Sequence, residues 1–270
     1  MASRLLELPD EGGSNASPDG SQIAVIGKAA QVLEALLLRP EGAAPTQLAA
    51  DLAINRSTAF RLLTSLERGR LVDRDPETGR YRLGLRFLTF GDAVRARIDV
   101  VNIADPVLRQ LRDEVRLTVY LSIRNEWGAV CLKRLAGPEV DVLAWKPGQW
   151  LPLHRGAGPR ALLAALPDTE LETYLAEPMN RTTRSGALTV DDVRQMVDIT
   201  RTRGWSLNVE DLTPGVSSIG VALQDISGSA QYSISVAGLA SRFQGSSLDD
   251  IAAAVMAAVS RIAAQIDGGR

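Results

Sequence analysis

The sequence predicts an α+β protein with an N-terminal winged helix-turn-helix domain, a linker helix and a C-terminal domain around a mostly antiparallel sheet. Residues 23–84 show three short helices with apolar periodicity followed by a β-hairpin. After Leu117 the pattern changes to alternating strands and helices. A chain of 270 residues is also long enough for two domains that each bury a core.

The composition argues against several classes of protein. The first 22 residues are rich in Gly, Ser, Asp and Glu and lack the basic and apolar regions of a signal peptide, so we expect a disordered tail. No apolar run approaches the ~20 residues that span a bilayer, so we expect no membrane partner. Cys131 is the only cysteine and His154 the only histidine, so an internal disulfide and a conventional metal site are not expected. We expect a cytoplasmic protein without a cofactor or metal.

Positive charge is concentrated in one segment. The whole chain has a formal net charge of −2, but residues 23–98 carry 12 Lys and Arg against 8 Asp and Glu, a difference of +4. The tail and the remainder are each at −3, from 1 against 4 and from 17 against 20. The excess lies where contacts to phosphates would be needed.

The elements of the first domain follow from periodicity and turn residues. A first helix is expected from Val25 to Leu38, and a second from Thr46, as N-cap, to Leu52. After the turn Ala53-Ile54-Asn55, a third helix is expected from Arg56 to Arg68 with Asn55 as N-cap. Its apolar stripe consists of Ala59, Leu62, Leu63 and Leu66. Residues 71–75 and 80–83 then form a hairpin around the turn at 76–79.

A long linker helix is expected from Leu85 to Asn102, within a linker at 85–104. Its apolar stripe is Leu85, Leu88, Gly91, Val94, Ile98 and Val101. Asp105-Pro106 is expected to start the next helix, in a second domain at residues 105–270. The predicted strands of this domain are 118–123, 129–135, 140–145, 218–224 and 232–237. Its predicted helices are 159–165, 168–176, 190–203 and 248–266.

The third helix has the features of a helix that binds in the major groove of DNA. Arg56, Ser57, Thr58 and Arg61 lie in its first two turns, opposite the apolar stripe. Arginine can bind guanine bidentately, and Ser and Thr can reach bases or phosphates. Arg80 and Arg82 point to the same side of the wing, with Tyr81 and Leu83 on the other. Thr46 and Gln47, at the start of the second helix, complete the expected DNA interface; an ordinary solvated face is the alternative.

The chain from about residue 23 to 266 resembles the IclR family of bacterial transcription regulators. The resemblance rests on an ordered set of segments rather than on one motif. In the first domain they are Ala30–Leu33, Leu48-Ala49, Ser57–Leu63 and Gly79–Gly84. In the second they are Leu151–His154, Arg160–Ala164, Arg203–Trp205, Glu210-Asp211 and the run from Gly220 to Gly238.

The resemblance implies a GAF-like C-terminal domain that binds a small effector, commonly a carboxylate or aromatic metabolite, and that forms dimers or tetramers. Ala157 and Gly158 would offer backbone N–H groups to a carboxylate at the start of a helix, where the dipole also favours an anion. The other residues matched to the family's effector cavity are Val140, Leu143, Asn208, Ser218 and Ser235. Trp145 and Trp150 flank the loop, where we expect core or interface packing; a preference for an aromatic acid is the alternative.

The sequence departs from the family at three places. Ala53 stands in the turn where members often have glycine, and Pro159-Arg160 stands where Gly-Lys is common. Asn208 and Ser218 are neutral at positions that vary among members, so the identity of the effector does not transfer.

Two other groups of residues could carry chemistry. His154 would need a nucleophile such as Cys131 and an orienting acid within reach, and no spacing indicates such a set. We therefore expect a structural histidine and no enzyme. Glu210 and Asp211 are interpreted as a turn or an interdomain contact.

We expect a sequence-specific regulator, more often a repressor, whose affinity for double-stranded operator DNA is controlled by a small organic acid. The linker helix would pair two chains into a homodimer or homotetramer. One alternative is an enzyme with a C-terminal catalytic domain and a winged helix used for protein interaction, which turnover of a ligand would reveal. Another is a DNA-binding protein whose second domain only oligomerises, which a thermal-shift screen with small acids would separate.

Overall fold

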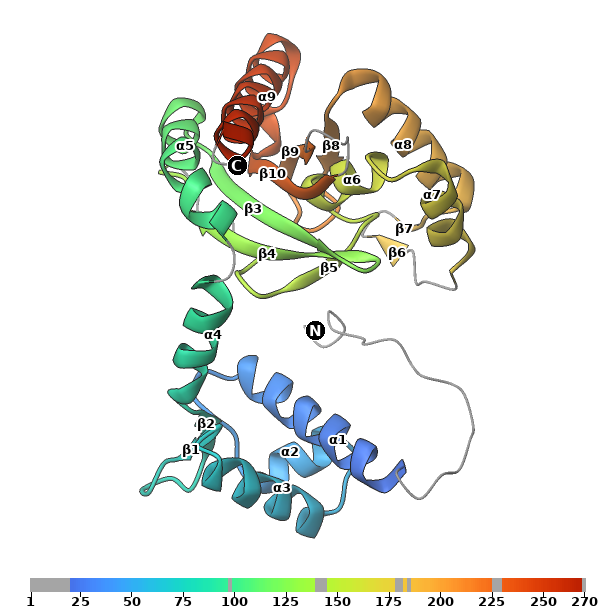
Figure 1. Ribbon diagram of the computed structural model, residues 1–270. Coiled ribbons are helices and arrows are strands. Elements are labelled where there is room, and N and C mark those ends of the chain that lie inside the picture. Colours follow the sequence, from blue (N-terminus) through green and yellow to red (C-terminus); the bar gives the residue numbers. More distant parts are fainter. Residues whose placement is uncertain are drawn as a thin grey trace. The chain divides into compact units, whose positions relative to one another are not determined.

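The computed structural model describes residues 20–96, 99–138, 145–177, 182–183, 186–224 and 230–268 (Figure 1). The chain divides into two compact units, residues 1–97 and 98–270. Most of the expected tail lies outside the described residues, and the first helix already begins at Gly20. Within the described part, no helix is long and apolar enough to cross a membrane.

The N-terminal unit contains the expected three helices and hairpin. Its elements are α1 (Gly20–Leu37), α2 (Pro45–Asp51), α3 (Arg56–Arg68), β1 (Val72–Arg74), β2 (Tyr81–Leu83) and α4 (Arg86–Ala96). The bounds of α3 are those predicted, and all four residues of its apolar stripe are buried. Leu62, Leu63 and Leu66 pack in one core with Val32 and Leu36 of α1 and Tyr81 of the hairpin. The winged helix-turn-helix layout is therefore confirmed.

The caps of α2 and α3 differ from the prediction. Thr46 is not the N-cap of α2, which is Ala44, with Pro45 at the first helical position. Proline suits that position because its missing N–H would have no partner there. Asn55 is the N-cap of α3, but its side chain makes no capping hydrogen bond. Between the two helices, Ala53 adopts a positive φ of 50°.

The linker region was predicted wrongly. α4 ends at Ala96, and α5 runs from Asp99 to Val115 with Pro106 in its interior. The prediction ended one helix before Pro106, because an interior proline removes a hydrogen bond and costs about 3 kcal/mol or more. α5 nevertheless continues because it buries a longer stripe, at ~1.5–3 kcal/mol for each large side chain. This stripe is Val100, Ala104, Val107, Leu108, Leu111 and Val115.

The expected apolar stripe of the linker is exposed on α4. Leu85, just before the helix, is 75% exposed, and Leu88 and Val94 are exposed as well. Phe90, which the prediction did not include, is also exposed on α4. The described residues of the N-terminal unit thus leave several large apolar side chains in water, on more than one side of α4.

The C-terminal unit is built on one six-stranded antiparallel sheet with the order β5-β4-β3-β10-β9-β8. The strands are β3 (Thr118–Asn125), β4 (Gly128–Leu135), β5 (Trp150–Pro152), β8 (Ser206–Val209), β9 (Val216–Gln224) and β10 (Ala230–Leu239). α5 and α9 (Gly245–Gly268) cover one face. The other face carries α6 (Ala157–Ala164), packed against α8 (Val190–Arg203), with α7 (Asp168–Ala176) in the same core.

Four of the predicted strands and the four predicted helices are present, with small shifts at their ends. The prediction missed β5 and β8, which have three and four residues and lie at the two edges of the sheet. Segments this short show too little alternation to be recognised. It also missed β6 (Thr182–Thr183) and β7 (Gly186–Ala187). Most of the strand predicted at 140–145 lies outside the described residues.

Side chains on the sheet alternate between two different environments. On β9, Ile219 and Val221 face the core shared with α5 and α9, while Gly220 faces α6. Gly220 is paired with Ser235 of β10 on one side and with Ser206 of β8 on the other. A Cβ at Gly220 would lie 2.4 Å from the carbonyl carbon of Ala157. Small residues on this face therefore allow the first turn of α6 to contact the sheet directly.

Candidate nucleic-acid interface and ligand pocket

The face of α3 opposite its buried stripe is exposed and cationic. Arg56, Ser57 and Arg61 are exposed, and Thr58 is half-buried. Among the described residues, the structure records no hydrogen bond or ion pair for the side chains of Arg56 and Arg61, although the Arg61 carbonyl accepts a hydrogen bond from Ser65 Oγ at 2.9 Å. Their guanidinium groups are therefore available to phosphates or to base edges.

Phe60 is a residue of this surface that sequence reasoning missed. Its side chain is 55% exposed, one helical turn after Arg56 and next to Arg61. It was missed because apolar residues were assigned to the core. Phe60 lies outside the spacing of the four buried residues, and that position was the available signal. An exposed phenyl ring can contact the methyl group of thymine.

The two arginines of the wing have different surroundings. Arg82 has a side chain that is 51% exposed and paired with Asp75, with 2.7 Å between Nη2 and Oδ2. Arg80 is half-buried, and its Nε donates to the carbonyl oxygen of Gly42 at 3.2 Å. Backbone hydrogen bonding, first from the Thr78 N–H, lowers the pKa of Asp75, with a smaller contribution from Arg82. Arg80 thus joins the wing to the turn after α1, and Arg82 is the more accessible cation.

Thr46 and Gln47 are exposed in the first turn of α2. α2 packs against α3, so both residues belong to the same helix-turn-helix pair as Arg56 and Arg61. Polar side chains and N–H groups at a helix start are common contacts to DNA phosphates.

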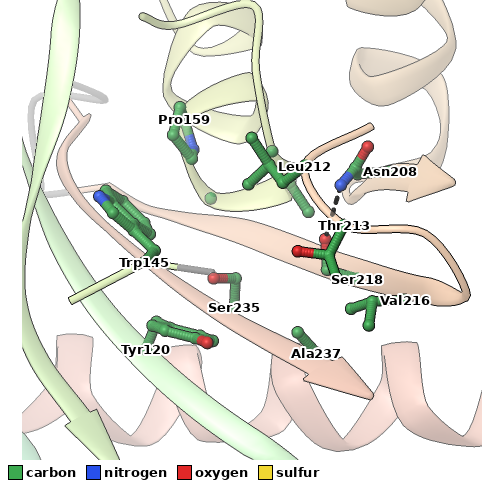
Figure 2. A pocket seen from close by; sticks show the side chains of 13 residues that line it. Tyr120, Trp145, Pro159, Asn208, Leu212, Thr213, Val216, Ser218, Ser235 and Ala237 are labelled. Carbon is green, nitrogen blue, oxygen red and sulfur yellow. Dashed lines mark hydrogen bonds between the residues drawn. The ribbon is translucent and has the colours of Figure 1, made fainter. Parts of the chain in front are cut away.

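A pocket of about 400 Å³, which includes the open space at its mouth, lies in the C-terminal unit beside the start of α6. Figure 2 shows an aromatic side formed by Trp145 and Tyr120, and a polar side with Asn208, Ser218 and Thr213. The complete lining is Tyr120, Trp145, Gly156, Ala157, Gly158, Pro159, Asn208, Leu212, Thr213, Val216, Ser218, Ser235 and Ala237.

Of the seven residues predicted for an effector site, five line this one pocket: Ala157, Gly158, Asn208, Ser218 and Ser235. Val140 and Leu143 lie outside the described residues. The prediction missed Tyr120, Leu212, Thr213 and Val216, which carry no motif of their own. They reach the pocket through strand pairing and through the loop between β8 and β9, which are not visible in sequence spacing.

The polar side offers hydrogen-bonding groups without a formal charge. Asn208 and Ser218 are both buried, and Asn208 Nδ2 donates to Ser218 Oγ at 3.3 Å. Gly156 is the N-cap of α6, so Ala157 and Gly158 occupy its first two positions. The N–H groups at these positions have no acceptor within the helix, and the helix dipole makes this end partly positive.

The aromatic side is rigid and neutral. Tyr120 and Trp145 stack with 6.0 Å between ring centroids. The indole N–H of Trp145 donates to the carbonyl oxygen of Gln149 at 2.8 Å, which fixes the ring. Burial raises the pKa of Tyr120 to about 12, so its hydroxyl stays protonated at neutral pH. Trp150 instead packs over Gly128, with its Nε1 3.4 Å from the Asn125 carbonyl oxygen.

Behind the pocket, one hydroxyl group attaches α6 to the sheet, and two others on the sheet bond to each other beneath it. Ser206 Oγ donates to the carbonyl oxygen of Ala157 at 2.6 Å, and Ser122 and Ser233 form a hydrogen bond of 2.7 Å. A Cβ at Gly158 would lie 3.1 Å from the Oγ atoms of both Ser233 and Ser235. The position of the ligand-facing turn thus depends on small side chains in the strands below it.

A buried ion pair lies beside the same turn. Arg160 Nη2 donates to Asp211 Oδ2 at 3.1 Å, and its Nε and Nη1 donate to the carbonyls of His154 and Leu207. Desolvation lowers the pKa of Arg160, and attraction by Asp211 opposes this. The prediction placed Glu210-Asp211 in a turn or an interdomain contact. The positive φ of Glu210, 53°, fits a turn, but Asp211 bonds within the C-terminal unit.

Neither His154 nor Cys131 lines the pocket. His154 is buried, and Tyr174 Oη lies 3.0 Å from its backbone N and 2.8 Å from its Nδ1. Burial raises the pKa of the Cys131 thiol to about 12, which leaves little thiolate at neutral pH. Over the described residues, no three His, Cys, Asp or Glu side chains come together in a way that could hold a metal ion.

Comparison with protein families gives matches to both units. Residues 25–76 match the IclR helix-turn-helix domain, and residues 93–264 match the bacterial transcriptional regulator IclR C-terminal domain. The transcriptional regulator KipR of Bacillus subtilis is 31% identical over 189 residues, which cover 70% of this chain and 75% of KipR. The transcriptional repressor AllR of Klebsiella pneumoniae is 30% identical over 223 residues, covering 80% and 82%.

Solved structures share the fold. IclR of Thermotoga maritima is similar with a TM-score of 0.73 and 20% identity, covering 90% of this chain and 98% of that one. An IclR homologue from Microbacterium hydrocarbonoxydans, in complex with 4-hydroxybenzoate, has a TM-score of 0.76 and 17% identity, covering 90% and 99%. At this identity the two structures support the architecture of the chain.

Proposed function

The chain belongs to the IclR family of bacterial transcriptional regulators, and we propose that it is a repressor whose affinity for its operator is controlled by a small organic acid. The observation that carries this proposal is the neutral pocket at the start of α6. It combines free N–H groups at Ala157 and Gly158, hydroxyl groups on one side and a rigid aromatic wall on the other. This arrangement suits a carboxylate attached to a ring.

An aromatic acid is favoured as the ligand class. Trp145 and Tyr120 offer a flat apolar surface, and the ligand named for the Microbacterium hydrocarbonoxydans homologue is 4-hydroxybenzoate. We infer binding without turnover, since the described lining contains no His, Cys, Lys, Asp or Glu to act as base or nucleophile. The repressor direction is supported by the name of the relative AllR.

DNA binding is assigned to α3, with Arg56, Ser57, Phe60 and Arg61 facing the major groove. Thr46, Gln47 and Arg82 contact phosphates in this proposal, and Arg80 supports the wing. Pairing of two chains is assigned to the exposed apolar side chains of α4. A pair of chains would present two recognition helices to a two-fold operator, as a homodimer or within a homotetramer. A ligand that favours one arrangement would change DNA affinity by about 5- to 150-fold.

The first experiment measures fluorescence anisotropy of the full chain on DNA upstream of its own gene, at several salt concentrations and against scrambled competitor. The Arg61→Ala variant should bind the operator about 5- to 150-fold more weakly, because a bidentate base contact contributes ~1–3 kcal/mol. Arg194→Ala is the matched control, since Arg194 is exposed and paired with Glu172 in the C-terminal unit. Unchanged operator binding by Arg61→Ala would remove α3 from the interface.

The pocket is tested separately with Gly158→Val, because a side chain there meets Ser233 and Ser235. Isothermal titration of 4-hydroxybenzoate should show binding to the wild type and at least tenfold weaker binding to the variant. DNA affinity without the acid should stay the same. Equal titration curves for the two proteins would place the ligand elsewhere, and no binding of any aromatic acid by the wild type would reject this ligand class.

A further inference from the structure

The loop between β8 and β9, residues 210–215, forms one wall of the pocket. It supplies Leu212 and Thr213 to the lining. The loop is closed on itself at its base, because the Glu210 N–H donates to the Val216 carbonyl at 3.0 Å. The Gly215 N–H donates in turn to Glu210 Oε2 at 2.8 Å. The base of the 210–215 loop is thus held in place, since the Ala240 N–H also donates to the Gly215 carbonyl at 2.8 Å, and the tip with Asp211 and Leu212 is the part that can move over the pocket.

Asp211 joins this loop to the start of α6. Its side chain is only 4% exposed. Oδ2 accepts hydrogen bonds from the Gly156 N–H at 3.2 Å and from Arg160 Nη2 at 3.1 Å. Leu212 follows the same path, because its Cδ1 lies 3.1 Å from the position that a Cβ of Gly156 would take. The loop thus contacts the residue that precedes the ligand-facing N–H groups.

The second oxygen of Asp211 is not satisfied in the same way. Oδ1 lies 4.0 Å from Nε of Arg155, which is beyond hydrogen-bonding distance. Both atoms are buried, and neither has a hydrogen-bond partner in the described structure. Buried polar atoms without partners are unfavourable, so a nearby arrangement that joins them is favoured. A displacement of the loop by about 1 Å would bring Oδ1 and Nε to an ordinary hydrogen-bond distance.

We propose that the 210–215 loop is the lid of the ligand pocket, and that Asp211 is its positioning residue, held by Gly156 and Arg160 in the open state and also by Arg155 when the lid closes. The proposal rests on the ligand-binding function proposed above. Closure moves Leu212 further over Gly156, toward the carboxylate of a bound acid. The bound acid and the contact between Asp211 and Arg155 therefore stabilise the same position of the loop, so each should strengthen the other.

Hydrogen exchange measured by mass spectrometry on the full chain tests both states. Without ligand, Asp211→Asn should speed exchange of the 210–215 loop and the start of α6 by roughly tenfold, because hydrogen bonds to a charged acceptor are the stronger ones. Exchange in α9 should not change. Asp168→Asn is the control, because Asp168 pairs with Arg201 at an exposed site of the same unit. An unchanged loop, or an equal increase in α9, would overturn the role of Asp211.

The closed state is tested with Arg155→Gln, which breaks no hydrogen bond of Arg155 Nε in the ligand-free structure but removes its ion pair with Asp211 at 4.0 Å. Without ligand, its loop should exchange only slightly faster than that of the wild type, because this ion pair includes no hydrogen bond. Saturating 4-hydroxybenzoate should slow loop exchange in the wild type, and this extra protection should be lost in Arg155→Gln. Equal protection in both proteins overturns the closure step, as does a wild-type loop that does not respond to acid shown by calorimetry to be bound. Absence of binding would reject the ligand class, and the ligand-free comparison of Asp211→Asn would still decide whether Asp211 holds the loop.

Discussion

On α3 the residues proposed to face DNA are exposed and support little packing, whereas around the pocket the polar residues are buried and hold neighbouring elements in place. Arg61 can be removed without opening a cavity. Ser206 cannot, because its hydroxyl joins β8 to the first turn of α6. In the N-terminal unit, function and stability are thus carried by different faces of one helix. In the C-terminal unit, the same residues contribute to both.

The largest expected effect concerns the contact between α6 and the sheet. Gly220→Ala should lower the free energy of unfolding of the C-terminal unit by about 2–3 kcal/mol and weaken ligand binding, because the new methyl group meets the Ala157 backbone. Gly27→Ala is the matched control in α1, where a Cβ meets nothing within 4 Å. It should raise stability by about 0.5–1 kcal/mol. Urea unfolding measures both, and equal curves for Gly220→Ala and wild type would show that α6 and β9 can separate freely.

The next effect separates function from stability on α3. Phe60→Ala should weaken operator binding by about tenfold, close to 1.4 kcal/mol, without lowering stability, since its ring is mostly in water. Operator DNA with uracil in place of thymine lacks the methyl groups. The wild type should therefore bind it less tightly than thymine-containing DNA, whereas Phe60→Ala should bind both DNAs equally. Leu38→Ala removes an exposed apolar side chain elsewhere in the unit and should leave this comparison unchanged. A thymine preference that survives in Phe60→Ala would contradict the contact.

A third prediction concerns Asp105, which contributes to the stability of the C-terminal unit but does not line the pocket. The pKa of Asp105 is lowered chiefly by a hydrogen bond from the Lys133 side chain, with a further one from Arg109. Its stabilisation is therefore present above the ordinary carboxyl value of 3.8 and is lost as the pH falls below it, through the lower folded pKa. Asp105→Asn should lower the free energy of unfolding by about 1 kcal/mol at pH 7. It should also make stability depend less on pH in the acid range, with unchanged ligand affinity. Thermal melts from pH 2 to 7 test this. A variant whose melting temperature falls with pH as steeply as that of the wild type would exclude Asp105 as the cause of the pH dependence.

The smallest effect concerns the turn before α3. Ala53 has a φ of 50°, which a residue with a Cβ adopts at a cost. Ala53→Gly should stabilise the N-terminal unit by about 0.5–1 kcal/mol and leave the C-terminal unit unchanged. Denaturation followed separately for the two units by hydrogen exchange would measure it. A loss of stability would mean that the methyl group of Ala53 contributes more packing than its backbone costs.

The same contrast explains what could be predicted from sequence. The bounds and buried stripe of α3 follow from residues within two turns of one another, and both agree with the structure. The boundary between the linker helix and the next helix was misplaced. The local signal, Pro106, is outweighed by the burial of α5 against strands that lie far away in sequence. The N-cap of α2 was misplaced because threonine is a common cap residue. The helix instead begins at Pro45, and its N-cap, Ala44, makes no side-chain hydrogen bond.

The pocket was only partly visible for a physical reason. Ala157, Gly158 and the serines were found through a family resemblance, which carries long-range information that spacing does not. Tyr120 reaches the pocket because it is paired across the sheet with Ser235, more than a hundred positions away in sequence. The role of Asp211 depends on an approach to Gly156 that no local pattern indicates.

The exposed apolar side chains at α4 have a consequence for how such a regulator would behave in a cell. A single chain leaves Leu85, Leu88, Phe90 and Val94 in water. If pairing covers them, as proposed, the amount of DNA-competent protein rises with the square of the chain concentration while chains are scarce. Doubling expression would then nearly quadruple operator occupancy at low abundance. The gene dose, and not only the ligand, would become an input to the switch.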